Sequence, residues 1–232
     1  MVSIVFPFAA AFIISLLLTP TLRAVASHYG FMAEPSISRW HKKPKPLLGG
    51  AAIAISFYVG ALIFMKAIAP VWVAILIPLI PFSVGLWDDL QEINPQTKLV
   101  GIIVAAAVLI ALGYNLAFTD IAPLNIFITI IWILGITNAM NLLDNMDGLS
   151  AGIAFIATAF LIYFFAANGR WEMVTVTALF SGSLLGFLIY NFHPASIFMG
   201  DAGSLFIGFL LSTLPMATGF QPTTSLFSVL IV

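Results

Sequence analysis

The sequence predicts an all-α fold, a polytopic membrane bundle with about eight spanning helices and the start of a ninth. Hydrophobic residues make up 62% of the 232 residues and charged residues only 7%, whereas an ordinary soluble domain has roughly 45–50% and 25%. Apolar runs of about 20 residues, the length of a membrane helix, recur along the chain and lack the alternation of β-barrel strands. Because lipid leaves backbone groups without partners, these runs are expected to be helical.

The apolar runs set the expected order of the spans. They lie at 2–26, 47–66, 70–86, 98–118, 121–142, 149–167, 171–190 and 203–220, with a ninth beginning near 223. The first run has no basic residue before it and Arg23 near its end, so it is expected to be a retained span rather than a cleaved signal peptide. The final "SLFSVLIV" is too short to cross a bilayer, so we expect one domain, residues 1–232, that stops inside an element.

Charged residues predict the orientation of the bundle. With the N-terminus outside, the loops near 27–46, 87–98, 142–148 and 191–202 share the inner side, which excess basic residues mark as cytoplasmic. The inner basic residues are Arg23, Arg39, Lys42, Lys43, Lys45 and Lys98, and the outer ones are Lys66 and Arg170. The acids Asp88, Asp89, Glu92, Asp144, Asp147 and Asp201 also fall inside, whereas Asp120 and Glu172 fall outside.

Composition also excludes some chemistry. The chain has no cysteine, which excludes disulfides, thiolate catalysis and Cys-ligated metal sites. A net charge of −1 gives no argument for a nucleic-acid partner.

"GLWDDL" places Asp88 and Asp89 side by side at the end of the third run. Adjacent carboxylates repel unless a cation or a proton compensates, so the pair is a candidate for metal or phosphate chemistry. The alternative is a solvated helix end.

"NAMNLLDNMDGLSAG" spaces Asn138, Asn141, Asp144 and Asp147 three residues apart. Three residues turn an ideal helix through about 300°, so all four can face one ligand only if the helix ends or distorts within "DNMDG". Asn145 and Gly148 are stop signals there. A capped polar turn between helices is the alternative.

"NFHPASIFMGDAGSLF" adds Asn191, Phe198, Asp201 and Ser204, and Gly200 and Gly203 let backbone approach a ligand closely. The first turn of the helix that follows is expected to direct free amide groups and a positive dipole towards an anion, unless Asp201 caps that helix. His193 is expected to be an ordinary loop residue. The basic "RWHKKPKPLLGG" either anchors the chain at anionic lipid or supplies charge for a phosphate-rich substrate.

Together and in this order, "PLLGG", "GLWDD", "NAMNLLDNMDGL" and "NFHPASIFMGDAGS" resemble the polyprenyl-phosphate N-acetylhexosamine-1-phosphate transferase family. The resemblance implies transfer of a sugar 1-phosphate from a UDP-sugar to undecaprenyl phosphate or a similar lipid, with release of UMP. It implies Mg²⁺ as the cofactor, with Mn²⁺ as an alternative. The partners it implies are the UDP-sugar, the polyprenyl phosphate and the bilayer. A second copy of the chain, in a homodimer, is a further alternative.

The same resemblance implies a role for each matched residue. Asp201 and Asn141 would hold the metal, and Asp88, Asp89, Asp144 and Lys98 would form the catalytic group near the phosphates. The residues implied to bind or shape the pocket for the substrate are Asn138, Asp147, Asn191, Phe198, Lys43, Gly49 and Gly50, with Asp147 and Phe198 at the uracil.

Two departures from the family and three alternatives remain. The family carries a later loop rich in histidine and arginine that this sequence does not contain, and "DNMDGLSAG" replaces the commoner "DGLDGL" pattern. N-acetylglucosamine 1-phosphate is the expected group, for cell-envelope polysaccharide or peptidoglycan synthesis at a bacterial plasma membrane, with the phospho-N-acetylmuramoyl-pentapeptide donor second. A transporter or channel would place its polar sites near the bilayer midplane, and an intramembrane aspartyl protease would place two proton-sharing carboxylates within its spans.

Overall fold

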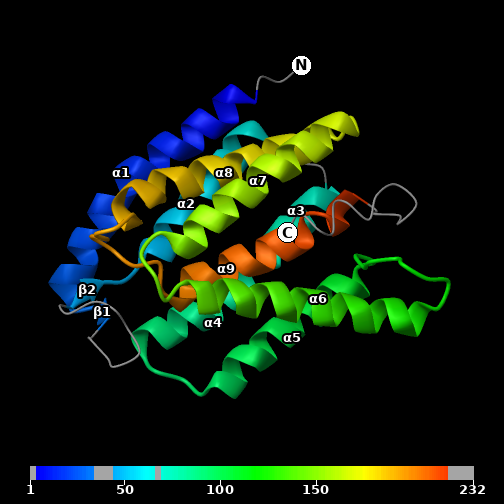
Figure 1. Ribbon diagram of the computed structural model, residues 1–232, viewed down its shortest axis with the longest axis horizontal. Coiled ribbons are helices and arrows are strands. Elements are labelled where there is room, and N and C mark those ends of the chain that lie inside the picture. The colour runs from blue at the N-terminus through cyan, green and yellow to red at the C-terminus, as the bar shows by residue number, and fades with distance from the viewer. Residues whose placement is uncertain (1–3, 34–43, 66–68, 219–232) are drawn as a thin grey trace.

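The computed structural model describes residues 4–33, 44–65 and 69–218, which form a bundle of elongated helices (Figure 1). The helices are α1 Val5–Tyr29, α2 Gly49–Phe64, α3 Ala69–Leu76, α4 Leu79–Leu90, α5 Pro95–Ala111, α6 Ala122–Leu143, α7 Leu149–Ala167, α8 Trp171–Asn191 and α9 Gly200–Thr213. A short 3-10 turn, Met216–Thr218, follows α9. The helical architecture confirms the predicted all-α class.

A two-stranded ribbon is an addition that composition did not predict. Strand β1 (Met32–Ala33) pairs antiparallel with β2 (Lys45–Pro46), with Met32 opposite Pro46. The amide of Leu47 also donates to the carbonyl of Phe31, 3.0 Å away. The ribbon therefore joins the end of α1 to the start of α2.

The predicted number of spans is not confirmed. Within the described residues, five segments are long and apolar enough to cross a membrane: α1, Val71–Leu90, α6, α7 and α8. Helices α2 and α5 are apolar but have only 16 and 17 residues, short of the roughly 20 that a bilayer requires. Helix α9 has 14 residues. The run expected near residue 223 lies outside the described residues.

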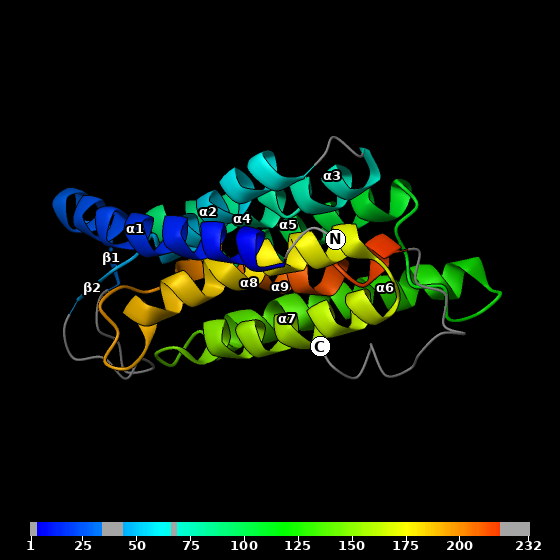
Figure 2. The same cartoon turned by 90° about the horizontal axis from the view of Figure 1, so that it is seen from above.

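Helix α9 occupies the middle of the bundle. It packs against α2, α4 and α6, and almost all of its side chains are buried. The ring of Phe206 lies 6.0 Å from that of Phe57 and 6.3 Å from that of Phe180, both edge to face, a favourable arrangement for aromatic pairs. Helix α8 packs in turn on α1, α2 and α7, and the view from above shows this layering (Figure 2).

The third predicted run is interrupted and then continues further than expected. Helix α3 ends at Leu76, and α4 begins after Pro78, whose missing N–H is tolerated at a helix start. Helix α4 then runs to Leu90. Asp88 and Asp89 are therefore in its last turn.

The helix ends where the asparagine–aspartate series required an interruption. Helix α6 ends at Leu143, and Gly148 adopts φ 71° at the start of α7, a left-handed conformation that glycine adopts without a steric penalty. This confirms the interruption predicted within "DNMDG".

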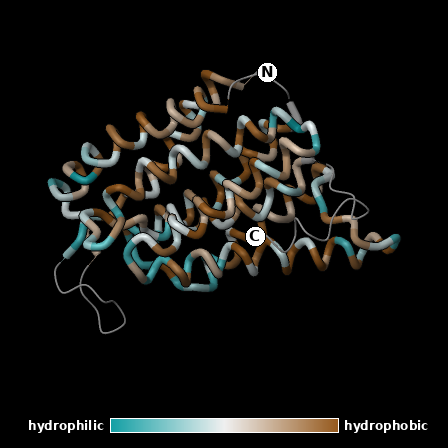
Figure 3. The backbone as a smooth tube through the Cα atoms, turned by 45° about the horizontal axis from the view of Figure 1, so that its top comes forward, coloured by the Kyte–Doolittle hydropathy of each residue, from teal (hydrophilic) through white to brown (hydrophobic). Residues whose placement is uncertain are grey.

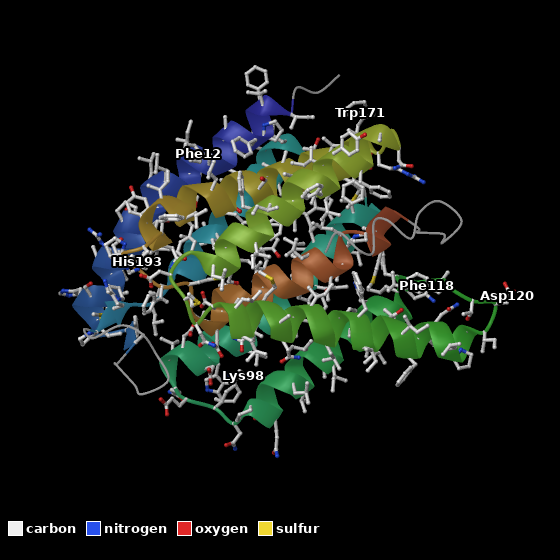
Figure 4. The ribbon with its side chains drawn as sticks, in the orientation of Figure 1. Phe12, Lys98, Phe118, Asp120, Trp171 and His193 are labelled. Atoms are coloured by element: carbon white, nitrogen blue, oxygen red, sulfur yellow. The ribbon has the colours of Figure 1, made fainter. Side chains whose placement is uncertain are left out.

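Hydrophilic segments gather mainly at the ends of the helices (Figure 3). Lys98 and His193 lie towards one end of the bundle, whereas Phe118, Asp120 and Trp171 lie towards the other (Figure 4).

Candidate functional site

A cavity of about 660 Å³ lies where the α4–α5 connection, the α6–α7 turn and the α8–α9 connection meet. Its lining includes nine of the residues that the sequence marked as site candidates: Asp88, Asp89, Lys98, Asn141, Asp144, Asp147, Asn191, Phe198 and Asp201. Three polar segments that are distant in the sequence therefore share one cavity.

The remaining site candidates lie elsewhere. Asn138 is exposed on α6, and its amide donates to the Leu134 carbonyl of the same helix at 2.7 Å. Asn138 precedes the end of α6 by more than one turn, so the break in the helix does not bring it to the cavity. Gly49 and Gly50 are buried beside the α8–α9 connection. Lys43 lies outside the described residues.

Lys98 links two of the carboxylates in the cavity. Its ammonium lies 2.9 Å from Asp88 Oδ2 and 2.5 Å from Asp201 Oδ2. Asp88 Oδ1 accepts a hydrogen bond from the Ile93 amide at 2.9 Å. Both Asp88 oxygens are therefore engaged, and the carboxylate holds Lys98 over α9.

The environment shifts the pKa values of Lys98 and Asp201, which lie outside the five segments long enough to span a membrane. Burial favours the neutral amine, but hydrogen bonds to Asp201 and Asp88 outweigh this and raise the pKa of Lys98. Burial, with Asp88 nearby, raises the pKa of Asp201 despite the opposing effect of Lys98. The lysine therefore stays a cation at neutral pH.

Asn141 approaches Asp201 from the other side. Its amide nitrogen lies 3.1 Å from Asp201 Oδ1 and 2.8 Å from Ser204 Oγ. Since this nitrogen makes both contacts, the Asn141 oxygen keeps its acceptor capacity for another partner.

The contacts of Asp89 correct the prediction that the start of α9 directs free amide groups towards an anion. The amides of Asp201 and Ala202, in the first turn of α9, donate to Asp89 Oδ1 and Oδ2 at 2.8 and 3.0 Å. The predicted anion at this helix end is therefore a carboxylate of the chain itself. Asp201 does not cap the helix, because its own amide is one of the groups being capped.

Asp147 is fixed by the loop that follows α8. Its Oδ2 accepts from the Ala195 amide at 2.9 Å and lies 2.9 Å from Nδ1 of His193. Asn191 braces the same region, because its oxygen accepts from the Gly148 amide and its nitrogen donates to the Ile197 carbonyl. The α6–α7 turn and the α8–α9 connection are thus joined by side chains.

The glycines of "PLLGG" act through close backbone contact. The amides of Gly49 and Gly50 donate to the carbonyls of Phe198 and Met199 at 3.0 and 2.8 Å. A Cβ on Gly50 would lie 2.2 Å from the Gly203 nitrogen. These glycines therefore position the segment that carries Phe198 and Asp201.

The cavity is strongly acidic, and its donors suit a particular kind of metal site. The part of the lining that the structure describes carries the carboxylates of Asp88, Asp89, Glu92, Asp144, Asp147 and Asp201, and one cation, that of Lys98. Among the described residues, no group of three or more His, Asp or Glu side chains is arranged to hold a metal ion alone. Mg²⁺ is commonly held by one or two carboxylates together with substrate phosphates, so Asp201 and the Asn141 oxygen fit a partial ligand set.

Sequence reasoning missed three neighbours of this site. Glu92 and Asn145 line the cavity, and His193 contacts Asp147 with a side chain that is 81% exposed. The acidity of the inner loops indicated Glu92, but the contact between His193 and Asp147 joins residues 46 positions apart and needed the fold.

Comparisons with known proteins match the part of the chain that contains the three polar segments of the cavity. The family model described as "Glycosyl transferase family 4" matches residues 71–219. The "probable undecaprenyl-phosphate N-acetylglucosaminyl 1-phosphate transferase" of Bacillus subtilis is 32% identical over 241 residues, which cover 100% of this chain and 67% of that protein.

Two further relatives show the range of named activities. The phospho-N-acetylmuramoyl-pentapeptide-transferase of Shouchella clausii is 31% identical, covering 94% of this chain and 74% of that protein. The decaprenyl-phosphate N-acetylglucosaminephosphotransferase of Mycobacterium tuberculosis is also 31% identical, covering 87% of this chain and 57% of that protein.

Proposed function

Because the chain belongs to glycosyl transferase family 4, we propose that it transfers N-acetylglucosamine 1-phosphate from its UDP-sugar to undecaprenyl phosphate or a similar polyprenyl phosphate. The observation that carries this proposal is the Lys98 ammonium held between Asp88 and Asp201 in a cavity at one end of an apolar bundle. A lipid phosphate can reach such a cavity from the bilayer, and a nucleotide sugar can reach it from water.

The reaction exchanges one bond to phosphorus for another. An oxygen of the lipid phosphate attacks the phosphorus attached to the sugar, and the bond from that phosphorus to the bridging oxygen breaks. UMP leaves with the bridging oxygen, and the lipid carries a diphosphate linked to the sugar. No oxidant, reductant or additional substrate is required.

Lys98 is the proposed phosphate contact in this reaction. Its ammonium can pair with the phosphate oxygens, and Asp88 orients it through the 2.9 Å contact. Asp201 and the Asn141 oxygen would hold Mg²⁺ or, alternatively, Mn²⁺. The ion, when bound, neutralises charge on the diphosphate and on the departing UMP.

Proton abstraction is not required of the acidic residues. A phosphomonoester has a second pKa near 6, so the lipid phosphate is mostly dianionic at neutral pH. Catalysis can therefore rest on positioning and on charge neutralisation, which are the main contributions in phosphoryl transfer.

Two other residues of the cavity suit the nucleobase. The ring of Phe198 offers a stacking surface, and Asp147, whose Oδ2 is held by the α8–α9 connection, has a second oxygen that can accept a ring N–H. Lys43, in the basic loop before α2, is proposed to add positive charge for the diphosphate. Asp144 also lines the cavity and is proposed to act on the phosphates.

One comparison favours a donor, and the position of the cavity argues against a transporter. N-acetylglucosamine is preferred because the B. subtilis relative, named for that sugar, aligns over 100% of this chain, with the muramoyl-pentapeptide donor second. A transporter would carry its polar site near the midplane, whereas this cavity lies at the connections between helices. The cavity is proposed to face the cytoplasm of a bacterial plasma membrane.

The test uses membranes that contain the protein. They are incubated with undecaprenyl phosphate, Mg²⁺ and radiolabelled UDP-N-acetylglucosamine or UDP-N-acetylmuramoyl-pentapeptide. We expect labelled lipid and an equal amount of UMP from the first donor, loss of both with EDTA, and recovery on adding Mg²⁺. Lys98→Met should lose transfer, whereas the α4 surface variant Ser83→Ala should keep it. If neither donor labels the lipid, the proposal is wrong.

A further inference from the structure

Asp89 lines the cavity, but both of its carboxylate oxygens contact the backbone of α9. Its two carboxylate oxygens accept from two successive amides, those of Asp201 and Ala202. The first amides of a helix have no partner within the helix, and the positive end of the helix dipole favours a negative group there. Asp89 therefore caps α9 from a different helix, α4.

The backbones of α4 and α9 are shaped for this contact. Gly200 adopts φ 75°, and a Cβ on it would lie 2.5 Å from Asp89 Oδ2. One turn before Asp89, a Cβ on Gly85 would lie 2.4 Å from the Asp201 carbonyl oxygen. Both glycines leave room for Asp89 to reach the start of α9, so the cap depends on close packing as well as on charge.

The neighbouring carboxylates therefore differ in what they contact. Asp88 contacts Lys98, a side chain that lines the cavity. Asp89 contacts the backbone amide of Asp201. The carboxylate of Asp201 in turn faces Lys98 and Asn141. Because an α-helix turns about 100° per residue, adjacent side chains necessarily point in different directions.

We propose that Asp89 is a positioning residue that caps α9 and thereby fixes the Asp201 carboxylate, and that it does not contact the substrate. The inference rests on the proposed function, because it concerns how Asp201 is presented to a divalent cation. It also implies that substrate phosphates do not bind at the α9 amides, which Asp89 already occupies.

The test compares Asp89→Asn, Gly85→Ala, their double variant and Ser83→Ala in the full chain. Asp89→Asn keeps the side-chain size but leaves only one acceptor oxygen. Gly85→Ala disturbs the same α4–α9 contact without altering a carboxylate. Ser83→Ala is the matched control, because Ser83 is exposed on α4 and bonds only to its own helix among the described residues.

Three quantities are measured: Mn²⁺ affinity by electron paramagnetic resonance, the thermal unfolding midpoint, and kcat and KM for transfer. For Asp89→Asn we expect about tenfold weaker Mn²⁺ binding, as for other residues that orient a metal ligand, with a matching fall in kcat and little change in KM. We expect a midpoint about 2–4 °C lower, because a helix cap is lost. Ser83→Ala should match the unaltered protein.

The double variant separates positioning from direct contact. If Asp89 acts through the α4–α9 contact, the double variant should be little worse than the more severe single one. Losses in kcat that multiply, or a loss of transfer with unchanged Mn²⁺ affinity, would overturn the inference. Mn²⁺ binding and unfolding require no sugar donor, so a protein that shows the expected shifts but transfers no sugar phosphate would contradict only the proposed function.

Discussion

Asp88 and Asp89 are adjacent in the sequence, yet one carboxylate pairs with Lys98 and the other with the backbone of α9. The pattern of two adjacent acids predicted that a cation or a proton must compensate them. It could not predict that the compensation is divided between a side chain and a helix end. That division depends on the rotation of α4 and on the position of a segment more than 100 residues later.

The pKa of Asp201 predicts how activity responds to pH and metal. Burial raises this pKa, so the carboxyl protonates at a higher pH than an exposed aspartate, and its protonated form is a poor metal ligand. Transfer should therefore fall as pH drops through the raised pKa. The proton and Mg²⁺ compete for the Asp201 carboxylate. Each tenfold increase in Mg²⁺ concentration should therefore move the acidic limb of the pH–rate profile to lower pH by up to about one unit.

The measurement is a set of pH–rate profiles at three Mg²⁺ concentrations. His193→Gln provides the comparison, because His193 contacts Asp147 rather than Asp201, and its acidic limb should respond to Mg²⁺ like that of the unaltered protein. An acidic limb that stays in place at all three concentrations would exclude competition at Asp201.

At the scale of helices, the sequence predicted most elements and missed those shaped by tertiary contacts. The order of the apolar runs and the break after α6 were predictable, because hydropathy and glycine act locally. The limits of α4 and α9 were not, since their ends are fixed by contacts between Asp89, Gly85 and the start of α9. The α1–α2 ribbon also depends on pairing between two strands that lie apart in the sequence, Met32–Ala33 and Lys45–Pro46.

The glycines of α8 show how closely these helices pack. A Cβ on Gly182 would lie 2.2 Å from the Phe8 carbonyl oxygen of α1, and one on Gly186 would lie 2.6 Å from that of Phe12. Small residues at such positions let helices approach within a membrane. Both glycines therefore lie at the α1–α8 interface.

Gly182→Ala should destabilise the protein by about 1–3 kcal/mol, because α1 and α8 must separate to admit the methyl group. Gly135→Ala on α6 is the control, since a Cβ there meets nothing within 4 Å of the described residues, and it should be neutral or slightly stabilising. Thermal unfolding of both variants in detergent measures the difference. Equal midpoints would show that the α1–α8 contact tolerates a larger residue.

Across the whole molecule, the convergence of the three polar segments was predictable from charge, but their contacts were not. Excess basic residues on alternate loops predicted one shared face, and the cavity joins residues from all four of those loops. The hydrogen bonds that position Asp147, Asp201 and Asn141 involve helix ends whose geometry no local pattern encodes. For the same reason, Asn138 fits the spacing of the series but lies outside the cavity.

The absence of cysteine from the sequence allows the orientation to be tested directly. Gln96→Cys, two residues before Lys98, and Asn168→Cys, three residues before Trp171, place single thiols at exposed positions. Lys98 and Trp171 lie towards opposite ends of the bundle (Figure 4). If the cavity faces the cytoplasm, a membrane-impermeant maleimide added to intact cells should label Asn168→Cys and not Gln96→Cys. Opening the cells should expose Gln96→Cys to the reagent, which confirms that its thiol is reactive. The reverse pattern in intact cells would place the cavity on the outer face, where a cytosolic UDP-sugar could not reach it, and would exclude the proposed donor.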